Sequence, residues 1–127
     1  MAHWLVQANA AAWRDRADRE VREWCVKRYR DRVTPGDDIA LWLTGGIGVV
    51  ATGRVTGPPY QWPDGSWHAP VDLPHRFFDA PVSRAVLKED PAFAGSAILR
   101  MPGAANPFPL TEGEWQALQK HDAARTR

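Results

Sequence analysis

Residues 39–55 read IALWLTGGIGVVATGRV, and this stretch decides the fold. Gly46, Gly48 and Ala51 match the pattern G-x-G-x-x-[GA] of dinucleotide-binding sites, which needs a helix directly after the glycines. The residues that follow are instead rich in β-branched side chains, which favour a strand. The sequence therefore predicts a β-hairpin that turns at Gly45–Gly46, and no phosphate-binding loop.

Upstream of the hairpin, the sequence predicts a strand, a helix and a second strand. HWLVQ at 3–7 suits a short buried strand, and Asn9 stands where it would cap a helix over Ala10–Arg19. Residues 22–33 alternate bulky apolar and charged side chains, which predicts a strand with Trp24 on one face and Cys25 on the other. TPGDD at 34–38 has the chemistry of a turn.

Downstream of the hairpin, residues 56–75 are rich in proline and turn-forming residues, which predicts a long aromatic loop. Strands are expected at 75–80 and 96–101, with a short helical turn at 83–87 between them. Thr111 and Glu114 form a capping box that starts a last helix. The sum is a single α+β domain over residues 1–127, with helices near both ends and a largely antiparallel, curved sheet between them.

Composition limits the class of protein. The 127 residues are 44% hydrophobic and 24% charged, as expected of one globular domain with a sizeable core. Cys25 is the single cysteine, so no disulfide forms within the chain. We see neither a signal peptide nor an apolar stretch of membrane-spanning length, and therefore expect a cytoplasmic protein with no membrane partner.

Residues that could carry catalysis match no recognised motif. Cys25 lies in an alternating segment with no base beside it. His68, Asp72 and His75 do not have the spacing of a metal site. We therefore expect no catalytic residue, no metal and no cofactor.

Cations and aromatic rings interleave between residues 22 and 32. The net charge of the chain is only +1, so a case for nucleic acid depends on local charge. Positive charge collects in KRYRDR at 27–32, where Tyr29 stands among the cations and Trp24 precedes them. If the charges were the only feature, a solvated face would explain them. Cations beside rings, however, bind phosphates and offer stacking surfaces to bases, which favours a nucleic-acid interface.

Motifs along almost the whole chain resemble the EVE domain, a member of the PUA-like superfamily. They are WLVQAN at 4–9, WCVKRY at 24–29, GDDIALW at 36–42, GVVATGRV at 48–55 and PFPLTEGEWQAL at 107–118. The resemblance implies a curved, mostly antiparallel β-barrel flanked by helices. It also implies a non-catalytic reader of modified bases, above all 5-methylcytosine and its derivatives in DNA. A nuclease or another effector is a candidate protein partner, which the sequence leaves open.

The resemblance also suggests site residues. A reader takes the base out of its stack and holds it between aromatic planes, and Trp24 matches the tryptophan of that cage. The second wall would come from Trp62, Trp67 or Trp42, whereas Trp4, Trp13 and Trp115 are expected in the core. The other pocket candidates are Gln7, Asn9, Cys25 and Thr44. The expected phosphate contacts are Lys27, Arg28, Arg30, Arg32 and Arg54, with Arg76 as a further candidate.

Two other functions fit the same sequence. The domain could act on RNA, as a module for tRNA or rRNA modification, because no residue can be assigned to a 2′-hydroxyl group. Alternatively, the pocket could hold a free nucleoside or another flat heterocycle, in a small-molecule-binding domain or an enzyme. The near-neutral net charge favours this second alternative slightly.

Overall fold

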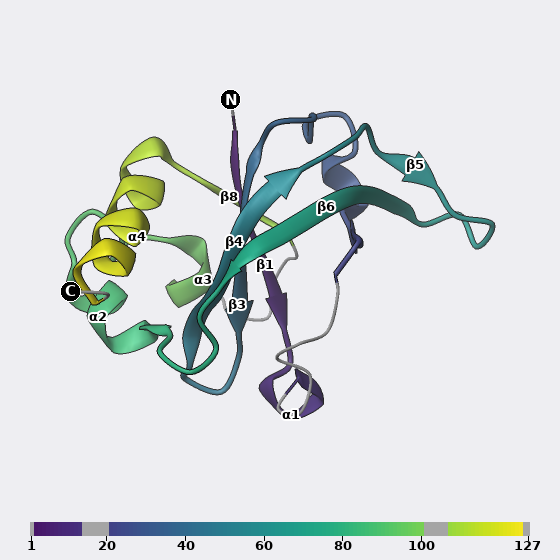
Figure 1. Cartoon of the computed structure of the whole chain (residues 1–127). Helices are drawn as coiled ribbons and strands as arrows, with labels where there is room; N and C mark the ends of the chain where they lie inside the picture. Colours follow the sequence, from purple (N-terminus) through teal and green to yellow (C-terminus); the bar gives the residue numbers. More distant parts are fainter. Residues whose placement is uncertain (1, 14–20, 101–106, 126–127) are drawn as a thin grey trace.

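The computed structural model describes residues 2–13, 21–100 and 107–125, and its strands form one curled, mostly antiparallel sheet. The strand order is β2-β6-β4-β3-β1-β8, with β5 paired to β6 and β7 paired to β4. In Figure 1 the sheet curls into a half-barrel, with α2, α3 and α4 on one side.

The strands and helices have the following bounds. The strands are β1 (His3–Ala8), β2 (Glu23–Cys25), β3 (Asp38–Leu43), β4 (Gly48–Val55), β5 (Tyr60–Gln61), β6 (Trp67–Arg76), β7 (Val82–Ser83) and β8 (Phe108–Leu110). The helices are α1 (Ala10–Trp13), α2 (Arg84–Glu89), α3 (Ala97–Arg100), α4 (Glu112–Arg125) and the 3₁₀ helix η1 (Lys27–Tyr29). No helix within the described ranges is long and apolar enough to cross a membrane.

The hairpin predicted from residues 39–55 is confirmed. β3 and β4 pair antiparallel, and the turn between them has Gly45 and Gly46 at φ of +85° and +83°, a region that favours glycine. The chain leaves this turn into β4 and not into a helix, so no phosphate-binding loop forms. A Cβ on Gly53 would lie 1.8 Å from the carbonyl oxygen of Asp72, so β4 needs glycine where it approaches β6.

Alternation of side chains divides the core between the two faces of the sheet. Along β3, Ile39 and Leu41 join a cluster inside the curl, on what we call the inner face. Ala40 and Trp42 join a second cluster beneath α2, α3 and α4, on what we call the helix face. The predicted core tryptophans are confirmed: Trp4 and Trp13 are buried on the inner face and Trp115 on the helix face.

A capping box and a helical turn predicted from the sequence are present on the helix face. The N–H of Thr111 donates to Glu114 Oε1 at 2.8 Å, and the N–H of Glu114 donates to Thr111 Oγ1 at 3.1 Å, so the capping box of α4 is confirmed. α2 covers most of the predicted helical turn at 83–87, and the side chain of Ser83 caps it.

The strand predicted over residues 22–33 is wrong beyond Cys25. The N–H of Val26 still donates to the carbonyl of Trp67 at 2.9 Å, but Lys27 then takes a φ of +48° and the chain turns into η1. Alternating apolar and charged residues cannot maintain a strand past a left-handed residue. The helix predicted over Ala10–Arg19 is α1 as far as Trp13, and residues 14–19 lie outside the described ranges.

The loop predicted at 56–75 is also wrong, because it contains β5 and most of β6. Prolines misled the prediction, since proline removes an amide donor but leaves its carbonyl able to pair. The carbonyl of Pro70 accepts the N–H of Thr56 at 2.9 Å. β6 ends at Arg76, so little of the strand predicted at 75–80 forms.

The strand predicted at 96–101 is a helix as far as the structure describes it. The N–H groups of Leu99 and Arg100 donate to the carbonyl of Ser96, and α3 buries Ile98 among the helices. A short apolar run has no periodicity that separates a strand from a helical turn.

Candidate nucleic-acid interface

Trp24 and Trp67 share the inner face on neighbouring strands. β2 pairs antiparallel with β6, and the register sets Trp24 opposite Ala69 and Cys25 opposite His68. Because side chains alternate along a strand, residue 67 points to the same face as residue 69 and hence as Trp24. Both tryptophan rings are half-buried against the inner cluster. The structure therefore brings together two of the candidate cage residues.

A second layer of aromatic rings holds Trp24. The ring centroid of Trp13 lies 6.1 Å from that of Trp24, with 34° between the ring planes, and Phe78 stacks on Trp13 at 6.4 Å. Asn9 caps α1, because its Oδ1 accepts the N–H of Ala11 at 2.8 Å. Asn9 thus fixes the short helix that carries Trp13. The sequence assigned Trp13 only to the core and missed Phe78, since no local pattern pairs these rings.

Thr44, the other polar candidate at this end of β1, is half-buried in the turn after β3. Its N–H donates to the carbonyl of Ala8 at 3.0 Å, which places it beside Asn9 in the structure. Both polar candidates therefore lie next to α1.

A buried carboxylate supports the base of the inner face. Asp37 is 1% exposed, and its carboxylate accepts the indole N–H of Trp4 at 2.9 Å and both the N–H and the hydroxyl of Thr34. Burial opposes ionisation of Asp37, but these hydrogen bonds and one from the N–H of Ala2 outweigh that cost and lower its pKa. The charged carboxylate fixes the end of β1 to the turn before β3.

Arg30 places a cation directly over one of the two rings. Its Cζ atom lies 5.0 Å from the centroid of the Trp67 ring, within the range of a cation–π contact, and its side chain is about half exposed. Lys27 is exposed at the start of η1, just after Val26. The inner face therefore has a cation beside its half-buried rings, and the exposed carboxylate of Asp31, 3.9 Å from Arg30 Nε, offsets part of its charge.

The other two cations of the basic segment are placed differently. Arg32 covers core rings, with Cζ 5.6 Å from the ring centroid of Trp4 and 5.4 Å from that of Tyr29. This contact fixes the arginine side chain close to the inner cluster. Arg28 belongs to η1, and its side chain lies outside what the structure describes.

Four pocket candidates are not brought together with Trp24. Cys25 points to the face of β2 opposite to that of Trp24. Trp62, which follows β5, lies on that opposite face too, because its ring stacks on His68 with 3.7 Å between ring centroids. Trp42 is 3% exposed within the helix-face cluster. Gln7 lies beside Trp42 in the parallel β1–β3 pair, so alternation directs it to the helix face too. The pleat of the strands separates residues that are close in sequence.

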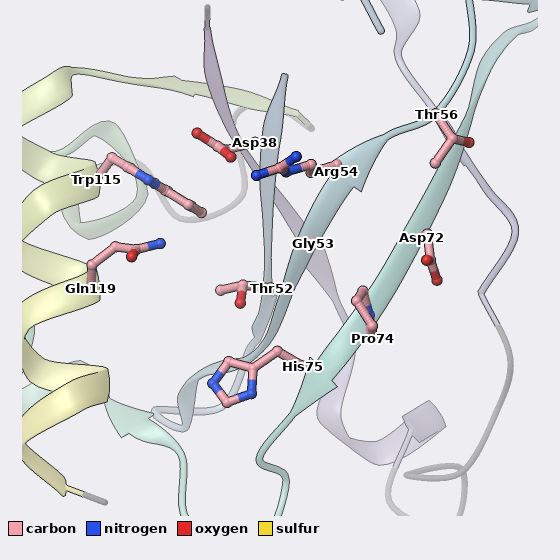
Figure 2. Close-up of a pocket in the computed structure, with 10 residues that line it drawn as sticks. All are labelled: Asp38, Thr52, Gly53, Arg54, Thr56, Asp72, Pro74, His75, Trp115 and Gln119. Carbon is pink, nitrogen blue, oxygen red and sulfur yellow. The ribbon is translucent and has the colours of Figure 1, made fainter. Parts of the chain in front are cut away.

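Arg54 also lies away from Trp24, in a groove of about 330 Å³ between the sheet and α4. Figure 2 shows Trp115 and Gln119 reaching from α4 toward Thr52, Arg54 and His75. The strand register sets Arg54 opposite Asp38 on one side and Asp72 on the other, so two acidic residues are its cross-strand neighbours. This arrangement disfavours a phosphate contact.

The remaining candidates are Arg76, as a phosphate contact, and a metal site. Arg76 donates from Nε to the carbonyl of Leu73 at 3.0 Å, so it stabilises the end of β6. Within the described ranges, no group of three or more His, Cys, Asp or Glu side chains could hold a metal ion.

Comparison with solved structures shows the same fold in other proteins. A hypothetical protein from Leishmania major matches with a TM-score of 0.80 at 15% identity, over 100% of this chain and 98% of that one. Rpa0253 from Rhodopseudomonas palustris matches with a TM-score of 0.71 at 16% identity, over 98% and 94%. Human THYN1, whose structure is a complex with DNA containing 5-methylcytosine, matches with a TM-score of 0.64 at 14% identity, over 96% and 98%.

Comparison with protein families identifies the domain. No curated protein matches the sequence. The family model of the EVE domain matches residues 2–121. The chain therefore belongs to the EVE domain family.

Proposed function

We propose that this protein is a non-catalytic module that binds a modified base in nucleic acid on the inner face of its half-barrel. The observation that carries the proposal is the pair of half-buried rings, Trp24 and Trp67, on one face, with the guanidinium of Arg30 over one of them. Membership of the EVE domain family and the likeness to THYN1, which was solved with methylated DNA, support it.

The base would leave its stack and pack against the two tryptophans. Stacking on an aromatic side chain contributes about 1–3 kcal/mol per base, which offsets the cost of extruding it. A methyl group adds only about 0.8 kcal/mol of burial, so discrimination also needs close fit around the methyl. 5-Methylcytosine or one of its derivatives in DNA is the proposed ligand, with Asn9 and Thr44 as the proposed contacts to its polar edge.

Phosphates would lie along the basic segment that follows β2. Arg30 lies over the Trp67 ring and Lys27 is exposed at the start of η1, and Arg28 and Arg32 belong to the same segment. Each phosphate contact releases counterions, so binding should weaken steeply with salt. A cytoplasmic location and action through a nuclease or another effector are part of the same proposal.

The test is binding to matched DNA and RNA oligonucleotides, unmodified or carrying 5-methylcytosine, 5-hydroxymethylcytosine or N6-methyladenine, at two salt concentrations. We expect a salt-dependent preference for a modified cytosine in DNA. A preference for RNA, or a free nucleoside that raises the melting temperature as much as the oligonucleotide does, would replace the proposal with one of the two alternatives. Weak, salt-independent binding to every strand would reject it.

Three variants test whether the base binds on the inner face. Trp24→Ala should remove the preference for the modified strand, while Trp62→Ala, which deletes a ring on the opposite face, should keep it. Trp24→Phe retains a smaller ring and should restore part of the preference. Circular dichroism verifies that each variant is folded. Wild-type preference in folded Trp24→Ala would contradict the assignment.

A further inference from the structure

The side of β2, β5 and β6 opposite to Trp24 and Trp67, which we call the outer face, carries two exposed aromatic rings. We call residues 60–69, which comprise β5, the following turn and the start of β6, the arm. Figure 1 shows it extending away from α2, α3 and α4. Tyr60 is 41% exposed and Trp62 is 37% exposed. Two large rings exposed two residues apart on the same face form a surface suited to a partner.

Trp62 is fixed in place before any partner arrives. One side of its ring stacks on His68, with 3.7 Å between ring centroids and 8° between ring planes. Its indole N–H donates to Glu23 Oε2 at 3.2 Å, and the hydroxyl of Tyr60 donates to the same oxygen. The N–H of Trp62 also donates to the carbonyl of Ser66 at 2.8 Å, which closes the turn. A ring held in this way loses little conformational entropy on binding.

Among the described residues, two carboxylates stand at these rings. The carboxylate of Glu23 lies between Tyr60 and Trp62, and Asp64 stands at the tip of the turn. Hydrogen bonds from the hydroxyl and N–H of Ser66 lower the pKa of Asp64, so it is ionised at neutral pH. Residues 55–75 contain no lysine or arginine. This surface would repel phosphates and attract a cation.

We propose that the outer face of the arm docks a protein partner through an arginine or lysine side chain, which lies on Trp62 beside the carboxylate of Glu23. An aromatic ring attracts a cation to its face, and a guanidinium can in addition pair with the carboxylate. The site goes beyond base recognition, because it uses the other face of the same strands and needs no nucleic acid. It would give a reader module a surface for its effector.

The experiment uses a defined probe, the peptide acetyl-Gly-Arg-Gly-Arg-Gly-amide. It is titrated into the ¹⁵N-labelled full chain, and the indole N–H signal of Trp62 is followed, assigned by its absence in Trp62→Phe. We expect a saturable shift in the millimolar range. The same peptide with citrulline in place of arginine has the same shape without the charge and should bind roughly two- to fivefold more weakly.

Variants separate this site from the inner face. Trp62→Ala should abolish the shifts of neighbouring arm signals, and Glu23→Gln should weaken peptide binding by a similar two- to fivefold factor, since the amide oxygen can still accept the two hydrogen bonds. Trp24→Ala should bind the peptide like wild type. Loss of base preference in Trp24→Ala with the peptide site intact, or the reverse, tells the two proposals apart.

Three results would overturn the docking proposal. The first is no saturable shift of Trp62 with the arginine peptide. The second is equal binding of the citrulline peptide, because the charge would then contribute nothing. The third is a shift of Trp62 with an unmodified oligonucleotide but not with the peptide, which would identify the arm as a stacking platform for nucleic acid.

Discussion

The two faces of β2 and the arm differ in charge although the same short strands supply both. On the inner face, Trp24 and Trp67 are half-buried and Arg30 lies over one of them. On the outer face, Trp62 is exposed and its indole N–H donates to the carboxylate of Glu23. Alternation sends Glu23 and Trp24, adjacent in sequence, to opposite sides.

This difference shows that aromatic content alone does not define a ligand. Stacking energy is available to any flat or cationic group, and the neighbouring charge decides which one is favoured. A cation beside the rings suits a base attached to phosphates, whereas a carboxylate suits an arginine or lysine. The predictions below test whether the two faces are independent in structure, in ligand and in salt dependence.

The largest effect is expected from removal of the carboxylate that supports the inner face. Asp37→Ala leaves the buried indole N–H of Trp4 and the N–H of Thr34 without their acceptor. Unfolding by urea should show a loss of roughly 2–5 kcal/mol. Asp72→Ala, at an exposed position of β6, is the control and should change stability by less than about 0.5 kcal/mol. Equal stability of the two variants would remove Asp37 as the support.

Acid should lower the stability of the protein, because it protonates one carboxylate that supports the inner face and one that joins α2 to α4. The pKa of Asp37 is lowered, and that of Asp90 is lowered to about 2 by hydrogen bonds from the N–H of Ala92 and from Lys120 and His121. Because both folded-state pKa values lie below the usual 3.8, the stabilisation is complete above about pH 4 and is lost as the pH falls toward 2. Thermal unfolding between pH 6 and 2 measures this.

In Asp90→Asn the fall in melting temperature below pH 4 should be shallower than in wild type. A melting temperature that is constant from pH 6 to pH 2 would contradict the role of both carboxylates.

The second wall of the proposed base site gives an effect of intermediate size. Trp67→Ala should weaken binding of the preferred modified oligonucleotide by roughly 5- to 150-fold, which corresponds to the loss of about 1–3 kcal/mol of stacking. Trp62→Ala, one turn away on the same arm, should retain wild-type affinity. If the two variants lost affinity equally, the two faces would not be independent.

The smallest effect concerns single phosphate contacts. Arg30→Gln should weaken binding of modified and unmodified strands alike and lower the slope of log K against log salt by about 0.7–0.9. Arg54→Gln is matched in charge but lies in the groove beside α4, so its slope should equal that of wild type. Identical slopes for the two variants would exclude a phosphate contact at Arg30.

Local patterns were sufficient for the parts of the fold that depend on neighbouring residues. The glycine turn, the capping box of α4 and the helical turn at 83–87 each follow from a few consecutive side chains. Residues 60–76 were not predictable in this way, because prolines make an isolated strand improbable and only pairing with β2, β4 and β5 stabilises it.

The site shows the same limit. Trp24 was predicted as a site residue from the resemblance to the EVE domain, and alternation within β2 predicts that its neighbour Cys25 points to the opposite face. The choice between Trp62 and Trp67 depends on the register of β6 with β2 and with β5. The pairing of β2 with β6 joins segments that are more than 30 residues apart in the sequence. No single-sequence pattern contains that register.

The most direct measurement of the central claim follows the tryptophan indole N–H signals of the ¹⁵N-labelled protein during titration with a DNA oligonucleotide that carries one 5-methylcytosine. The two-face account predicts that the signals of Trp24 and Trp67 shift and saturate together, and that the signal of Trp62 keeps its position. A saturating shift of Trp62 with unchanged Trp24 and Trp67 would place the base on the outer face and contradict the account.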